Sequence, residues 1–61
     1  MGKRALRKRI ESLIERVQDH ELKIRTEREK QDPNQGLIRH WEAEIFAFRT
    51  SIDNARRRLG S

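Results

Sequence analysis

Apolar residues recur in two stretches of the chain, with steps that alternate between four and three residues. The members of the first stretch, which ends in two polar residues, are Leu6, Ile10, Leu13, Val17, His20, Ile24, Glu27 and Gln31. The members of the second are Ile38, Trp41, Ile45, Phe48, Ile52, Ala55 and Leu59. Such steps average 3.5 residues, the period of a helical stripe that packs against a coiled-coil partner, whereas strands alternate every two residues. The pattern predicts an all-α fold, with helices over residues 3–31 and 37–59 and Gly60 capping the second.

The segment over residues 32–36, between the two stretches, has the composition of a turn. Pro33 lacks an amide hydrogen and disfavours a helical residue before it, so the first helix should end near residue 31. Asp32 and Gln35 have the spacing of a capping box for the second helix. Asn34 is an alternative cap, which leaves the start of that helix open by two or three residues.

A short turn between two helices makes an antiparallel hairpin, and facing residues then have numbers that add to about 68 if the turn is centred on Asn34. The two stripes satisfy this condition in six layers: Ile10–Leu59, Leu13–Ala55, Val17–Ile52, His20–Phe48, Ile24–Ile45 and Glu27–Trp41. Because the stripes are phased independently, their agreement on one register is strong support for the hairpin. We therefore expect a single helical-hairpin domain over residues 1–61, with coiled-coil-like packing.

Some apolar residues lie outside both stripes, and they indicate a second contact face. These residues are Ile14, Leu22, Leu37 and Phe46. A hairpin of two helices leaves half of each stripe in water, and domains of this size often need a partner surface to complete their core. We expect these residues to support self-association, most simply as a homodimer that forms a four-helix bundle.

Charged residues make up 41% of the chain, with 15 basic and 10 acidic residues and a net charge of +5. Their distribution is uneven, because residues 10–53 are mildly acidic while both ends are strongly basic. The basic residues of the two ends are Lys3, Arg4, Arg7, Lys8, Arg9, Arg56, Arg57 and Arg58. A hairpin would bring these eight cations to one end of the molecule. They are the candidate residues for binding an anionic partner or nucleic acid.

Two kinds of partner fit this basic end. Arginine forks match carboxylate and phosphate groups, so the protein could be a small adaptor that docks an acidic protein. The alternative is a small nucleic-acid-binding regulatory protein that makes sequence-nonspecific phosphate contacts. The aromatic residues Trp41, Phe46 and Phe48 lie away from the chain ends, so recognition by base stacking is not expected there. We therefore favour the adaptor.

His20 is the one histidine in a stripe, and two interpretations of it remain open. As a neutral polar residue among apolar layers, it would help to set the register of the hairpin. As a pH-sensitive group, its protonation would place a charge in an apolar layer, opposite Phe48. The second interpretation predicts that the assembly weakens as the pH falls through about 6.

No pattern in the sequence indicates catalysis or metal binding. His40 and Glu44 are four residues apart on one helix face, but a structural zinc site needs about four ligands. Glu27 is expected to pack its stem against Trp41 while its carboxylate reaches solvent, with no second carboxylate beside it for acid–base chemistry. The chain has no cysteine, glycine-rich phosphate loop, nucleophile elbow or HExxH motif. We expect a non-enzymatic protein without cofactor, metal or small-molecule substrate.

Two further expectations concern surface charges and location. Opposite charges four residues apart, such as Glu21 with Arg25 and Arg49 with Asp53, predict ion pairs within each helix.

No apolar run approaches the ~20 residues that span a bilayer, and the basic start is not followed by the apolar core of a signal peptide. We therefore expect a cytoplasmic protein with no membrane span.

Overall fold

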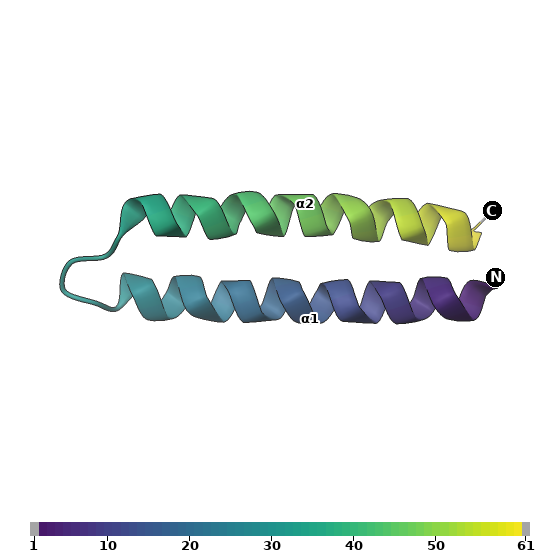
Figure 1. Ribbon diagram of the computed structural model, residues 1–61, viewed down its shortest axis with the longest axis horizontal. Helices are drawn as coiled ribbons and strands as arrows, with labels where there is room; N and C mark the ends of the chain where they lie inside the picture. The colour runs from purple at the N-terminus through teal and green to yellow at the C-terminus, as the bar shows by residue number, and fades with distance from the viewer. Residues whose placement is uncertain (1, 61) are drawn as a thin grey trace.

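Two antiparallel helices form the whole of the computed structural model, which describes residues 2–60. Helix α1 comprises Lys3–Arg28 and helix α2 comprises Gln35–Gly60. They lie side by side along a rod of 47 × 14 × 14 Å, with both chain ends at the same end of the rod (Figure 1). This confirms the predicted all-α hairpin; Met1 and Ser61, which the predicted domain includes, lie outside the described residues.

The connection between the helices is shifted toward the N-terminus relative to the prediction. Helix α1 ends at Arg28 rather than near residue 31, and α2 begins at Gln35, two residues before the predicted start. Of the two candidate caps, Asn34 is the one used: its Oδ1 accepts a hydrogen bond from the backbone N–H of Leu37 at 3.0 Å. Helix α2 also continues through Gly60, so this glycine is the last helical residue and not a left-handed cap.

The core lies along the line where the two stripes meet, as the heptad pattern predicts. Its buried members are Ile10, Val17, Ile24, Ile38, Ile45, Ile52 and Ala55. The partly buried residues packed around them are Leu6, Leu13, Ile14, Trp41, Phe48 and Leu59. The rings of His20 and Phe48 meet edge to face with centroids 5.2 Å apart, which confirms the predicted level of this pair. Of the residues in the two predicted stripes, only Gln31 is exposed, because α1 ends before it.

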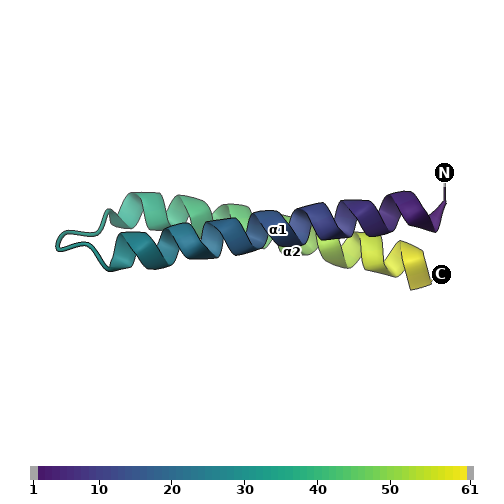
Figure 2. The same ribbon diagram turned by 90° about the horizontal axis from the view of Figure 1, so that it is seen from below.

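The hairpin exposes more surface than a compact protein of its mass. Its accessible area is 5176 Å², against about 4200 Å² expected for a globular monomer of 7.4 kDa. Even Ile38, the most buried residue among those described, keeps 2% of its area accessible. The two helices twist gently around each other, as the view in Figure 2 shows. Both edges of the helix–helix contact are therefore open to a partner.

Candidate interaction surfaces

The structure brings the two basic segments of the chain together. Residues 3–9 of α1 and residues 56–58 of α2 lie at the end of the rod opposite the turn (Figures 1 and 2). We call this region, with the eight cations named above, the basic end; all eight side chains are exposed. Arg9 and Arg58 come from different helices and line one small pocket of about 110 Å³ together with Ser51 and Asn54.

Most cations of the basic end have no acidic partner. Within residues 2–60, no ion pair involves Lys3, Arg4, Arg7, Lys8, Arg9, Arg56 or Arg58. The dipole of α2 favours basic residues in its last turn, which contains Arg57 and Arg58. The first turn of α1, in contrast, has no acidic residue and begins with Lys3 and Arg4, although cations there oppose the helix dipole. The basic start of α1 therefore has no structural explanation in the helix itself.

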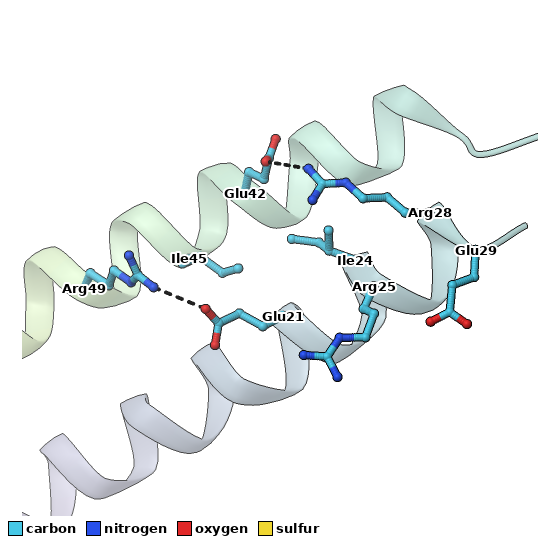
Figure 3. Close-up of a pocket in the computed structure, with 8 residues that line it drawn as sticks. All are labelled: Glu21, Ile24, Arg25, Arg28, Glu29, Glu42, Ile45 and Arg49. Carbon is cyan, nitrogen blue, oxygen red and sulfur yellow. Dashed lines mark hydrogen bonds and ion pairs between the residues drawn. The ribbon is translucent and has the colours of Figure 1, made fainter.

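One edge of the hairpin carries opposite charges that pair across the two helices. Arg49 donates a hydrogen bond to Glu21 at 3.2 Å, and Arg28 donates one to Glu42 at 3.3 Å (Figure 3). We call these four residues the paired edge. They border a groove of about 610 Å³. The sequence prediction of a pair between Glu21 and Arg25 was wrong, because the antiparallel register places Arg49 opposite Glu21.

The floor of the paired edge is apolar. Figure 3 shows Ile24 and Ile45 between the helices, with an ion pair crossing on either side of them. A second groove of about 390 Å³ is bordered by Glu21 and Arg49 and extends toward the basic end, where Ile14 lines it. An apolar strip bordered by compensated charges therefore runs along this edge.

The opposite edge holds a cluster of two histidines and a carboxylate. The Nε2 atom of His20 lies 2.7 Å from Oε2 of Glu44, and the Nδ1 atom of His20 lies 2.9 Å from the carbonyl oxygen of Arg16. The other oxygen of Glu44 lies 2.6 Å from Nε2 of His40. Since both nitrogens of His20 face acceptors, only its imidazolium form can donate both hydrogen bonds.

This geometry changes the expected role of His20. The hydrogen bond from His20 is the largest cause that holds the pKa of Glu44 below its ordinary value of 4.5; the charges of His40, His20 and Lys23 act in the same direction and burial opposes them. A positive His20 would thus face a carboxylate and a carbonyl, not an uncompensated apolar layer. The pH-dependent weakening near pH 6 stays a prediction, although its premise of a charge in a purely apolar layer does not match these two contacts.

Glu27 connects the end of α1 to the turn through a hydrogen bond and an ion pair, a set of contacts that we call the clasp of Glu27. Its side chain is buried, its Oε2 accepts a hydrogen bond from the backbone N–H of Asn34 at 3.0 Å, and its Oε1 lies 3.0 Å from Nζ of Lys30. The hydrogen bond from Asn34 is the largest cause that lowers the pKa of Glu27 below 4.5. The expectation that this carboxylate reaches solvent was wrong, because the chain folds back over it after Arg28.

The four residues predicted to support self-association lie on different parts of the hairpin. Leu22 and Phe46 are 60% and 74% exposed, and Leu37 is also exposed, whereas Ile14 packs partly against the core. Leu22 lies roughly opposite the stripe of α1, at about 100° per residue. Phe46 lies four residues after Glu42 and three before Arg49, so it is adjacent to the paired edge. Ile14 and Phe46 therefore share a side of the hairpin that Leu22 does not.

The comparisons with known proteins do not identify the chain. No protein-family model matches it, and no curated protein or solved structure matches it either. Among residues 2–60, no cluster of three or more histidine, cysteine or acidic side chains has the arrangement of a metal site. Neither of the two described helices is long and apolar enough to cross a membrane. The arrangement of charge and apolar surface is therefore the basis for a functional proposal.

Proposed function

We propose that this protein is a non-enzymatic, self-associating adaptor whose basic end docks an acidic partner. The observation that carries this proposal is the convergence of two basic segments, distant in sequence, into one exposed group of cations. Seven of these cations lack an acidic partner within residues 2–60. A cluster of unpaired like charges repels itself, and an anionic surface that binds it removes this repulsion.

An acidic protein fits the basic end better than a single-stranded nucleic acid. Proteins that bind single strands without sequence preference combine cations with aromatic side chains on which bases stack. The rings of Trp41 and Phe48 pack against the core, and Phe46 lies beside the paired edge in the middle of the rod. No aromatic residue belongs to the basic end, so its chemistry is that of charge and arginine forks alone.

The paired edge is the surface that we assign to self-association. A second copy of the hairpin would cover the apolar floor around Ile24 and Ile45 and the adjacent Ile14 and Phe46. The charges along this edge already compensate one another, so two copies can approach without strong repulsion. The hairpin exposes roughly 1000 Å² more than a compact monomer of equal mass, which is close to the area that each partner of a stable dimer buries.

Substitution of cations at the basic end tests the docking proposal. We expect the protein to bind a labelled decaglutamate peptide at low salt, with an affinity that falls as salt rises, because exposed charges are screened. The double variant Arg4→Gln/Arg7→Gln should bind this peptide several-fold more weakly in fluorescence anisotropy, at about 0.2–1 kcal/mol per exposed pair. The double variant Arg25→Gln/Arg39→Gln removes the same charge away from the basic end and should bind like the wild type.

A second binding experiment, with a DNA duplex in place of the peptide, decides between the two classes of partner. A 20-base-pair DNA duplex is titrated against the same protein at ~150 mM salt, where the smaller gain from counterion release weakens nonspecific phosphate contacts. Tighter binding of the duplex than of the peptide under these conditions would overturn the adaptor proposal. Equal loss of peptide binding in the two double variants would also contradict it, since net charge and not the basic end would then be responsible.

A further inference from the structure

Four cations follow one another at intervals of seven residues along the edge opposite the paired edge. These residues, which we call the basic edge, are Arg9, Arg16, Lys23 and Lys30. The first three belong to α1, and Lys30 lies in the turn, two residues after the end of the helix. Intervals of seven residues return to nearly the same face of a helix, so the row runs along α1 from the basic end to the turn.

Contacts with α2 place each member of the basic edge on one side of the hairpin. Arg9 lines the small pocket at the basic end, and the guanidinium carbon of Arg16 lies 6.0 Å from the centroid of the Phe48 ring. Lys23 and Lys30 both line a groove of about 310 Å³ that Trp41 borders. The row is thus a feature of the folded hairpin as well as of the sequence.

Two acidic residues on this side, Glu44 and Glu27, are engaged within the protein, whereas Asp19, four residues before Lys23, is exposed and forms no ion pair within residues 2–60. Glu44 is bound by the two histidines, and Glu27 is bound by Lys30 and by the backbone of Asn34. Within residues 2–60, no ion pair joins Arg9, Arg16 or Lys23 to an acid. Unlike the paired edge, the basic edge therefore presents three exposed cations, Arg9, Arg16 and Lys23, that form no ion pair within residues 2–60 and are open to an external anion.

The spacing of the row specifies the shape of that anion. At 1.5 Å per residue, successive cations lie about 10.5 Å apart, and Arg9 and Lys23 are separated by about 21 Å. A second helix running alongside α1 repeats its side chains at the same interval, so acids at every seventh residue would meet the cations in turn. The groove between Leu22, Thr26 and Trp41 offers room for an apolar side chain of such a helix.

A second copy of this chain cannot supply those acids. No two of its ten acidic residues lie seven positions apart, so no face of either helix presents a matching acidic row. We propose that the basic edge docks an acidic amphipathic helix of a different protein, with carboxylates facing Arg9, Arg16 and Lys23 and an apolar residue in the groove beside Trp41. This inference rests on the proposed function, because it names the shape of the acidic partner and extends its contact beyond the basic end.

Trp41 makes this inference testable, because it is the only tryptophan in the chain and borders the groove. The probe is a 28-residue synthetic helix with glutamate at every seventh position and leucines beside that row. A second peptide of the same composition has its glutamates at irregular intervals. We expect the regular peptide to bind several-fold more tightly and to change the emission of Trp41, because it covers the groove.

Matched variants locate the binding surface. We expect Arg16→Gln/Lys23→Gln to weaken binding of the regular peptide roughly tenfold, and the charge-preserving Arg16→Lys/Lys23→Arg to retain most of it. The double variant Arg25→Gln/Arg39→Gln should leave it unchanged. Circular dichroism of each variant confirms that the hairpin is intact, which separates lost binding from lost folding.

Three results would overturn the inference. Equal affinity for the regular and irregular peptides would show that spacing is not recognised. Peptide binding that leaves Trp41 emission unchanged and responds to Arg4→Gln/Arg7→Gln, but not to Arg16→Gln/Lys23→Gln, would restrict docking to the basic end; the proposed function would then stand without this inference. A 20-base-pair duplex that displaces the regular peptide at ~150 mM salt would assign the edge to nucleic acid instead.

Discussion

Glu44 connects the two helices through a histidine from each of them. His20 reaches it from α1 and His40 from the preceding turn of α2, at 2.7 and 2.6 Å. Only 14% of the His20 side chain is exposed, so its bond to Glu44 is shielded from solvent more than an ordinary surface ion pair. The same bond lowers the pKa of Glu44 and so makes the carboxylate form the stable one in the folded state.

Neutralising Glu44 should lower stability in a pH-dependent way. Because its pKa is depressed on folding, its contribution is present above the ordinary value of 4.5 and is lost as the pH falls through the folded-state pKa. We expect Glu44→Gln to melt at a lower temperature than the wild type at pH 7, and the difference to close below pH 4.5. Thermal melts by circular dichroism from pH 8 to pH 3 measure this.

Glu15→Gln is the control for that experiment, since Glu15 is exposed and takes part in no ion pair within residues 2–60. It should leave the melting curve almost unchanged at every pH. A wild-type protein that loses stability between pH 8 and pH 6 would favour the interpretation of His20 as a pH-sensitive group.

Which residues are buried could be predicted, but the polar contacts among them could not. The stripe positions of Ile24 and Ile45 follow from periodicity alone, because any close packing of two helices buries their apolar faces. The bond from His20 to Glu44 depends on the offset and rotation of one helix against the other, which a register centred on the turn does not specify. The clasp of Glu27 depends on the path of the chain after α1, which no heptad pattern describes.

At the level of elements, the turn shows how local chemistry sets helix ends. Residues 29–34 connect the helices, and two hydrogen bonds close the end of α1, from the N–H of Glu29 to the carbonyl of Arg25 and from that of Lys30 to Glu27, both at 3.2 Å. The side chain of Asn34 then caps α2. The existence of both helices and the turn could be predicted. The start of α2 shifted by two residues because two caps were available, and α1 ends three residues before the position that Pro33 predicted.

Removing the cap of α2 should destabilise the hairpin modestly. We expect Asn34→Ala to reduce the free energy of unfolding by about 1 kcal/mol, the usual cost of losing an N-cap acceptor. Asn34→Asp retains an oxygen acceptor in the same place and should keep most of the stability. Urea denaturation of the three proteins measures the difference; equal stabilities of the alanine and aspartate variants would show that the side chain of Asn34 does not act as a cap.

At the level of the whole molecule, the two edges of the hairpin differ in charge. The paired edge compensates its own charges across the helices, and the basic edge does not. A total charge of +5 could be read from composition, and the meeting of both chain ends followed from the predicted hairpin. The division into two edges required the observed cross-helix pairs, because a residue beside a stripe faces solvent or a partner charge depending on the register.

Self-association through the paired edge predicts a contrast between two exposed apolar residues. Phe46 lies beside this edge and Leu22 lies on the back of α1, and their exposed fractions are similar. We expect Phe46→Ser to shift a dimer toward monomer in sedimentation velocity, because it removes an aromatic contact at the interface. Leu22→Ser should leave the dimer unchanged, and a wild-type protein that stays monomeric at high concentration would contradict the proposal.

The position of the turn also governs how the hairpin opens. Contacts next to the turn, such as that between Glu27 and Asn34, close only a short loop, whereas Ile10 and Leu59 close nearly the whole chain and lose more loop entropy. The two helices should therefore zip together from the turn outward and separate in the reverse order. The like charges of the basic end lie where this separation begins, so their mutual repulsion favours opening of the hairpin at that end. An anion bound there would keep the two helices together.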